Sequence, residues 1–162
     1  VMVLDFDAHH GDGTEEILAD RPGVRFLSLF QWPLFPHRRM EPTPSNAVLS
    51  PLPAGAGGEE IRNVVENVWL PEIDKFQPDL MILSAGFDAH CEERIAQLKA
   101  GEMDYACVTR LLVEASFAYC EGRLVSVLEG GYELRSLARS VFTHLQGLIR
   151  NPLPAETCKD PN

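Results

Sequence analysis

The chain has 162 residues, a formal net charge of −10 and a hydrophobic content of 45%, which together predict one globular domain with a buried core. Its acidic balance, 24 acidic against 14 basic side chains, disfavours direct binding to a phosphate backbone. No apolar stretch reaches the roughly 18 residues that a membrane-spanning helix needs, and no basic and apolar leader opens the sequence. We therefore expect a cytoplasmic protein, or a nuclear one in a eukaryote, with no direct contact to nucleic acid or membrane. The four cysteines form no CxxC pair and are interpreted as reduced thiols.

Both ends of the sequence bear on the domain boundaries. Residues 1–4 are apolar and have the pattern of the middle of a buried strand, so we expect the sequence to be a piece of a longer protein. Residues 151–162 are rich in proline and charge, which predicts a flexible tail. The domain is therefore expected to occupy residues 1–150.

In chain order, short apolar runs alternate with segments in which apolar residues recur at helical spacing. Strands are predicted at residues 1–6, 24–30, 47–52, 79–85 and 123–128. Helices are predicted at residues 14–19, 59–76, 104–119 and 134–149, with Pro71 expected to kink the second of them. Residues 31–46 are rich in proline, show no period and are expected to form a long loop. This alternation predicts a parallel, doubly wound α/β sheet, in which ligands collect at the carboxyl ends of the strands.

Several large or charged side chains are interpreted as structural. Three aromatic side chains are predicted to lie in the core: Trp69, Phe117 and Phe142. Two histidines are expected at the surface or at the edge of the core: His37 and His144. The loop at residues 31–46 also contains a pair of arginines that is expected to be solvated, with the steering of an anionic group as the alternative: Arg38 and Arg39.

The first predicted strand runs into a turn that is crowded with acids and imidazoles. Asp5, Asp7 and His9 alternate with other residues, and alternate residues of an extended chain project to the same side. Carboxylate oxygen and imidazole nitrogen are both good ligands for a divalent metal such as zinc. A plainer interpretation is a set of solvated turn acids that cap the following helix. The pattern of this strand end alone leaves both interpretations open.

Two further predicted strands end in residues of the same kind. The fourth strand is followed by Asp88 and His90, and the fifth is followed by Gly130, Gly131 and Tyr132. Paired glycines let the backbone approach a ligand closely and deliver a tyrosine hydroxyl to the same edge, although Gly-Gly-Tyr alone is more often just a turn. Three such strand ends in one chain favour a functional site at this edge of the sheet.

Three motifs give the sequence a strong resemblance to one known family. They are DFDAHHGDGT at residues 5–14, SAGFDAH at residues 84–90 and LEGGY at residues 128–132, and they resemble motifs of the zinc-dependent histone deacetylase superfamily in order and spacing. This superfamily includes acetylpolyamine amidohydrolases and acetoin-utilisation proteins and is related in fold to arginase. The resemblance extends to residue 149. It implies the C-terminal portion of a catalytic domain of arginase-deacetylase type, an incomplete three-layer α/β/α fold.

The resemblance implies roles for individual residues around a metal ion. Asp7, His9 and Asp88 match the zinc ligands of the family, with Fe²⁺ or Mn²⁺ as alternative metals, and they leave a position open for water and a substrate carbonyl. Tyr132 matches the tyrosine that donates a hydrogen bond to the oxyanion of the tetrahedral intermediate. The implied reaction is hydrolysis of an N-acetyl amide by metal-activated water, in acetyl-lysine of a protein or in an acetylated small amine.

Other matched residues surround this implied metal site. Asp5 and Asp12 match acids that orient the catalytic histidine pair of the family. A structural potassium site is implied at Asp5, Asp7, His9, Ser28 and Leu29. The channel that admits an arm resembling acyl-lysine is implied at Phe35, Gly130 and Gly131.

The sequence also departs from the family pattern. The catalytic histidine pair of the family lies upstream of the first matched motif and has no counterpart in this sequence, so the isolated chain is expected to be inactive or nearly so. Residues 37–40 replace the usual glycines of the channel loop, and residues 91–95 replace an Asp-Pro, which leaves the substrate preference open. Two other functions stay open: an arginase-like binuclear metallohydrolase, which would need paired acids at the second strand end, and a noncatalytic metal-binding or acyl-binding module.

The resemblance further implies the order of the strands, which is third, second, first, fourth, fifth. The strand at residues 123–128 would then be an open edge where the N-terminal strands of the family lie. An open edge is a template for pairing with another chain. We therefore expect the fragment to form a homo-oligomer or to aggregate.

Overall fold

A parallel sheet of five strands is the centre of the computed structural model, which describes residues 1–149. The strands are β1 (Met2–Asp5), β2 (Arg25–Gln31), β3 (Ala47–Leu52), β4 (Met81–Ala85) and β5 (Leu124–Leu128). Their order across the sheet is β3-β2-β1-β4-β5, which confirms the predicted order, and all neighbouring pairs are parallel. The predicted flexible tail, residues 151–162, lies outside the described residues.

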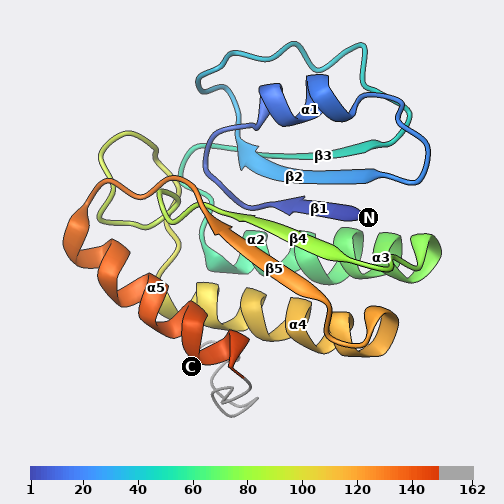
Figure 1. Ribbon diagram of the computed structural model, residues 1–162. Helices are drawn as coiled ribbons and strands as arrows, with labels where there is room; N and C mark the ends of the chain where they lie inside the picture. Colours follow the sequence, from blue (N-terminus) through green and yellow to red (C-terminus); the bar gives the residue numbers. More distant parts are fainter. Residues whose placement is uncertain (150–162) are drawn as a thin grey trace.

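Helices cover both faces of this sheet. The helical segments are α1 (Asp12–Leu18), α2 (Gly58–Val64), η1 (Val65–Trp69), α3 (Leu70–Phe76), α4 (Glu102–Cys120) and α5 (Leu134–Leu148). Figure 1 shows α1 on one side of the sheet and the remaining helices on the other side. The predicted three-layer α/β/α architecture is therefore confirmed.

The second predicted helix is confirmed, with an irregular middle. The chain is helical without a break over residues 58–76, and its middle segment, η1, is π-helical shortly before Pro71, where a kink is predicted. Pro71 comes shortly after η1 and has no N–H to donate to the carbonyl four residues earlier. The wider π-helical turn before the proline accommodates this missing hydrogen bond.

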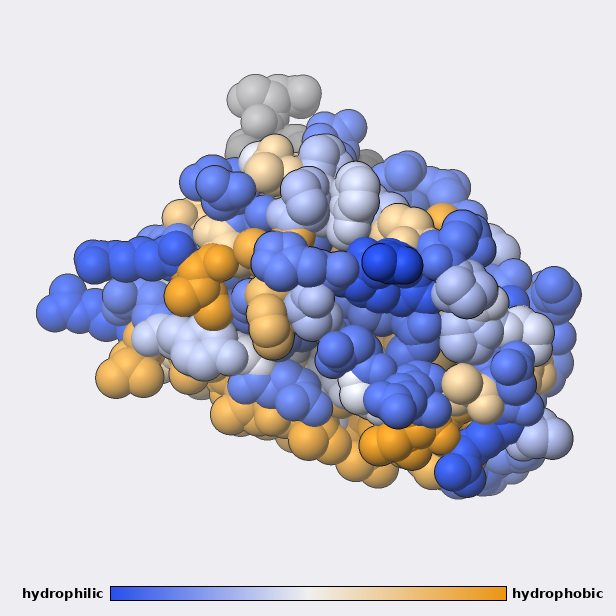
Figure 2. All heavy atoms as spheres, turned by 90° about the horizontal axis from the view of Figure 1, so that it is seen from above, coloured by the Kyte–Doolittle hydropathy of each residue, from blue (hydrophilic) through white to orange (hydrophobic). Residues whose placement is uncertain are grey.

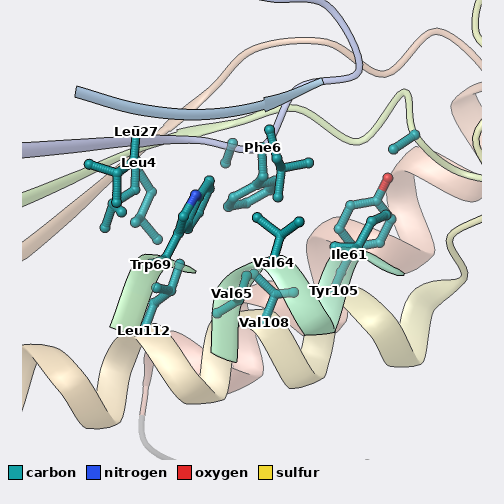
Figure 3. Packing of buried hydrophobic residues seen from close by; sticks show 14 of the residues in the cluster. Leu4, Phe6, Leu27, Ile61, Val64, Val65, Trp69, Tyr105, Val108 and Leu112 are labelled. Carbon is teal, nitrogen blue, oxygen red and sulfur yellow. The ribbon is translucent and has the colours of Figure 1, made fainter. Parts of the chain in front are cut away.

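The core lies between the sheet and the helices that follow β3 (Figure 3). Leu4 and Leu27 point from the sheet toward these helices, and Trp69 of η1 lies between them and Leu112 of α4. Trp69 is fully buried, as predicted. Burial of each leucine contributes on the order of 2 kcal/mol, so this packing fixes β1 and the residues that follow it.

Helix α5 packs against α4 with a polar and small-residue face. The residues that it buries are Ser136, Ser140, His144 and Gly147. Phe142 of α5 is 59% exposed and Phe117 of α4 is 42% exposed, so the predicted core positions are wrong for both. Small and hydroxyl side chains let the two helices approach closely. Leu137 and Val141 of α5 are partly buried against the core, whereas Phe142 and Leu145 lie on the outside.

His144 lies in the seam between α4, α5 and β5. Its Nδ1 is 2.6 Å from Thr109 Oγ1, and its Nε2 is 2.8 Å from Ser126 Oγ. The two hydroxyls satisfy both ring nitrogens, which allows a neutral imidazole to be buried. The expected position at the surface or core edge is therefore wrong for His144, whereas His37 is exposed as expected.

The structure gives the state of three of the four cysteines. Cys91 and Cys120 are free thiols, as predicted. Cys107 is disulfide-bonded, so the interpretation of reduced cysteines is wrong there, because sequence spacing does not reveal which thiols approach one another. Cys158 lies outside the described residues. No helix in the described part of the chain is both long enough and apolar enough to cross a membrane.

Candidate functional site

Three strand ends meet at the carboxyl edge of the sheet. β1 and β4 pair so that Asp5 lies beside Ser84, and β4 and β5 pair so that Ala85 lies beside Leu128. The segments that follow these three strands therefore emerge next to one another (Figure 1). This is the edge at which parallel α/β sheets bind their ligands.

Two carboxylates and one imidazole form a tight cluster at this edge. His9 Nδ1 is 3.1 Å from Asp7 Oδ1 and 2.8 Å from Asp88 Oδ2. One ligand atom from each of the three side chains lies within 4.8 Å of the other two. Asp88 is fully buried, while Asp7 and His9 are partly exposed. The three residues predicted as metal ligands are thus brought together, and their donor atoms suit a divalent cation.

Backbone amides from neighbouring strand ends hold the two carboxylates in place. The N–H of Ala8 donates to Asp88 Oδ1 over 2.8 Å, and the N–H of Gly130 donates to Asp7 Oδ2 over 2.8 Å. The N–H of His9 donates to Asp7 Oδ1 over 2.8 Å. Each carboxylate is therefore oriented by the protein itself and keeps an oxygen directed toward the imidazole.

Gly130 is required by this close approach. A methyl group at its Cα would lie 2.5 Å from Asp7 Oδ2 and 2.6 Å from Asp88 Oδ2. Any larger residue would displace both carboxylates. The following Gly131 adopts a φ of 134°, a conformation that other residues rarely adopt, so the two glycines together set the path of the chain toward Tyr132.

The electrostatics of the cluster favour a positive charge at its centre. Hydrogen bonds to Asp7 and then to Asp88 raise the pKa of His9 to about 10. Burial raises the pKa of Asp88 above its ordinary value. Two carboxylates that converge on one point of low solvent exposure repel one another unless a cation lies between them. The arrangement therefore has the charge balance of a cation site.

The acids predicted to lie behind the metal site occupy different environments. Asp5 is buried, accepts a hydrogen bond from the N–H of Asp7 over 3.0 Å and has a pKa well above its ordinary value because of burial. Asp12 is exposed at the start of α1, where its Oδ1 accepts from the N–H of Gly13 over 2.8 Å. The structure thus places Asp5 against the cluster and Asp12 at the exposed start of α1, and their orienting roles stay predictions.

The residues implied for potassium lie on β1, on β2 and in the turn that follows β1. Asp5 pairs with Ser28 across these strands, and both Ser28 and Leu29 are fully buried. Ser28 Oγ lies 3.1 Å from His10 Nδ1, so this hydroxyl already has a protein partner. The potassium assignment stays a prediction.

A cavity of about 320 Å³ lies beside the cluster and is lined in part by Asp7, His9, Gly130 and Tyr132. The side chain of Tyr132 is 63% exposed. Burial, followed by the charges of the nearby carboxylates, raises the pKa of this phenol. Phe35, predicted to line the substrate channel, is exposed, and its ring centroid lies 6.5 Å from that of His9.

Sequence reasoning missed a charged network beside the cluster. Arg38 donates to both carboxylate oxygens of Glu15, over 2.7 Å from Nε and 2.5 Å from Nη2. Glu15 Oε2 also lies 2.5 Å from His10 Nε2. The Arg38 side chain is only 9% exposed, so the expectation of a solvated arginine is wrong. This network ties the long loop that carries Phe35 to α1.

A model of the histone deacetylase domain matches residues 1–148. The chain belongs to the histone deacetylase family. It is 37% identical over 140 residues to a probable deacetylase from Archaeoglobus fulgidus, an alignment that covers 83% of this chain and 39% of that protein. It is 30% identical to the histone deacetylase-like amidohydrolase of Pseudomonas aeruginosa, covering 94% of this chain and 44% of that protein.

Solved histone deacetylase structures share the fold. The crystal structure of the HDA15 HD domain superposes with a TM-score of 0.81 at 29% identity and covers 91% of this chain and 43% of that one. The structure of the histone deacetylase Clr3 gives a TM-score of 0.80 at 29% identity and covers 91% and 26%. The predicted family and its arginase-deacetylase fold are therefore confirmed, and the chain spans less than half the length of these histone deacetylase relatives.

Proposed function

We propose that this chain supplies the metal-binding part of an enzyme that hydrolyses an N-acetyl amide. The observation that carries the proposal is the meeting of Asp7, His9 and Asp88 beside a cavity that Tyr132 lines. Family membership supports the reaction class, because relatives are named as deacetylases and amidohydrolases. The proposed substrate is acetyl-lysine in a protein or an acetylated small amine.

Asp7, His9 and Asp88 are proposed to hold one zinc ion, with Fe²⁺ or Mn²⁺ as alternatives. Three protein ligands with a further position open to water are the pattern of catalytic zinc sites. Such an ion, when bound, lowers the pKa of water and polarises a carbonyl group. In the part of the chain that the structure describes, this is the only such group of three ligand residues, which favours one metal over an arginase-like pair.

Tyr132 is proposed to stabilise negative charge on the substrate. Its hydroxyl would donate a hydrogen bond to the oxygen that becomes an oxyanion when water attacks the amide carbon. The position of Tyr132 in the lining of the cavity beside Asp7 and His9 supports this role. Gly130 and Gly131 support it as well, since they let the chain pass close to the metal ligands before it reaches Tyr132.

Proton transfer is proposed to need residues from outside this chain. Asp5 and Asp12 would orient a histidine pair that further polypeptide contributes and that acts as general base and acid. Phe35 would form one wall of the channel that receives the acylated arm. The isolated chain is therefore expected to bind the metal without appreciable turnover.

Metal content and hydrolysis together test this proposal. We expect one zinc per chain by mass spectrometry, and hydrolysis of a fluorogenic acetyl-lysine peptide or an acetylated polyamine only when the chain is joined to the upstream part of the enzyme. Two metals per chain would favour the arginase-like alternative. One metal with no hydrolysis by the complete protein would favour a noncatalytic metal-binding or acyl-binding module.

The variant Tyr132→Phe tests the oxyanion role in the complete enzyme. Removal of one oxyanion donor typically lowers kcat by about a hundredfold or more, with much less effect on substrate binding. We expect KM and zinc content to stay close to those of the unmodified enzyme. A normal kcat in the variant would make Tyr132 a structural residue.

A further inference from the structure

A single carboxylate oxygen outside the metal cluster holds the backbone of the Tyr132 segment. Glu93 Oε1 accepts a hydrogen bond from the N–H of Tyr132 over 2.6 Å and another from the N–H of Glu133 over 2.5 Å. These amides immediately precede α5, which begins at Leu134. A negatively charged acceptor is favourable there for two reasons. A carboxylate forms stronger hydrogen bonds than a neutral acceptor, and the first amides of a helix carry a partial positive charge.

Tyr132 depends on its backbone for its position. Its side chain is 63% exposed, and among the described residues its hydroxyl has no hydrogen-bond partner. On the N-terminal side, the N–H of Gly130 donates to Asp7 Oδ2 and its carbonyl accepts from the N–H of Phe87. These two hydrogen bonds fix the backbone before Gly131, a residue type with few conformational restrictions. The hydrogen bonds to Glu93 fix the backbone after Gly131, at Tyr132 itself.

The segment that carries Glu93 is itself attached to the end of β4. The N–H of Glu93 donates to the carbonyl of His90 over 2.9 Å, and the N–H of Cys91 donates to the carbonyl of Ala100 over 2.8 Å. His90 comes two residues after Asp88 of the metal cluster. Glu93 thus connects the strand end that carries Asp88 with the strand end that carries Tyr132.

We propose that Glu93 is a positioning residue, which holds the Tyr132 hydroxyl at the metal cluster by fixing the backbone on the far side of Gly131. This inference rests on the proposed function, since it assigns the positioning to the oxyanion donor of that reaction. Loss of the carboxylate would free two consecutive amides and let the exposed side chain swing away. The cluster itself would stay intact, because Glu93 contacts none of its three residues through a hydrogen bond.

The chain offers a matched control in the neighbouring acid. Glu92 Oε1 accepts from Arg139 Nη2 over 2.6 Å and does not contact the Tyr132 segment. The variants to compare are Glu93→Ala, Glu93→Gln and Glu92→Ala. Glutamine keeps an oxygen in the same place without its charge, so Glu93→Gln should lie between the unmodified chain and Glu93→Ala.

Amide hydrogen exchange in the 162-residue chain gives the first measurement. In Glu93→Ala we expect the amides of Tyr132 and Glu133 to exchange about tenfold faster or more, because each loses a hydrogen bond to a charged acceptor. In Glu92→Ala we expect these two amides to be unchanged. Equal exchange in the unmodified chain and in Glu93→Ala would overturn the proposal.

Steady-state kinetics of the complete enzyme give the second measurement. We expect Glu93→Ala to lower kcat about tenfold or more with little change in KM and in zinc content, Glu93→Gln to lower it less, and Glu92→Ala to match the unmodified enzyme. Faster exchange with an unchanged kcat would make Glu93 purely structural and would overturn the positioning role. A complete unmodified enzyme without hydrolytic activity would instead refute the proposed function, and the exchange measurement would still report separately on the hydrogen bonds to Glu93.

Discussion

Asp88 combines two tasks in one side chain. Its Oδ1 accepts from the N–H of Ala8, while its Oδ2 faces His9 at 2.8 Å. The first contact fixes the turn after β1, and the second places a negative charge at the cluster. Substitution by asparagine separates the tasks, because an amide oxygen still accepts from Ala8 but carries no charge.

The variant Asp88→Asn should therefore bind zinc weakly while keeping its fold. Loss of a residue that merely supports a metal ligand costs about 10-fold to 100-fold in affinity, so loss of a charged ligand should exceed that range. Competition with a chromogenic chelator measures the affinity, and circular dichroism checks the fold. Asp79→Asn, which lies two residues before β4 begins and so at the end of the sheet opposite its carboxyl edge, is the matched control. Equal affinity of Asp88→Asn and the unmodified chain would remove Asp88 from the ligand set.

The two-residue spacing after β1 and the positions of the strand ends made the meeting of Asp7, His9 and Asp88 predictable, whereas other contacts between residues distant in the sequence were not. Asp7 and His9 follow a strand at the two-residue spacing that projects side chains to one side, and Asp88 follows the neighbouring strand. Glu93 meets the N–H of Tyr132, 39 residues away, and Arg38 meets Glu15, 23 residues away. No local pattern marks these pairs, because the fold alone brings them together.

At the scale of elements, the side chains that α5 buries differ from those that its sequence predicts. Phe142 of this helix is predicted to lie in the core, yet it is exposed. The helix fully buries two serines, a glycine and His144, while Leu137 and Val141 are partly buried against the core. The imidazole of His144 can be buried in the contact between α4 and α5 because hydroxyl groups of α4 and β5 form hydrogen bonds with both of its nitrogens. Periodicity locates such a helix correctly, but it does not reveal which of its faces a neighbouring helix will meet.

The buried His144 should make stability depend on pH. Burial lowers its pKa to about 4 from the ordinary value of 6.5, so between these values the unfolded chain binds a proton that the folded chain excludes. The free energy of unfolding should therefore fall as pH drops from 6.5 to 4, by up to about 3 kcal/mol from this residue. Urea unfolding at several pH values measures the effect.

The variant His144→Gln isolates this contribution from those of other titrating groups. The variant should be less stable at pH 7, since glutamine cannot meet both hydroxyls in the same way, but its stability should fall less on acidification. Parallel pH profiles for the two proteins would show that His144 does not titrate in this window.

At the scale of the whole molecule, β5 is an open edge of the sheet. Among the described residues β5 pairs with β4 alone, and Val125 and Val127 are 50% and 47% exposed. The strand contains neither charge nor proline, the features that usually protect an edge. Figure 2 shows hydrophobic residues gathered along one margin of the molecule. We propose that a second copy of the chain pairs with β5.

Sedimentation at tens of micromolar tests this association. We expect the unmodified chain to form a dimer, because pairing covers the backbone groups and the valines of the edge. The variant Ile17→Lys, which alters an apolar side chain of α1 that is 66% exposed, is the matched control and should stay dimeric. A stable monomer of the unmodified chain would contradict the proposal.

The sequence of β5, LVSVL, reads the same in both directions. If two copies pair antiparallel about a two-fold axis at Ser126, leucine faces leucine, valine faces valine and serine faces serine. Such a symmetric contact closes on itself, so association stops at two copies instead of growing into a fibre. Each Val125 would then lie opposite Val127 of the other copy. Two lysines at these positions should hold the copies apart by direct repulsion, whereas lysine at Val125 with glutamate at Val127 should keep them together.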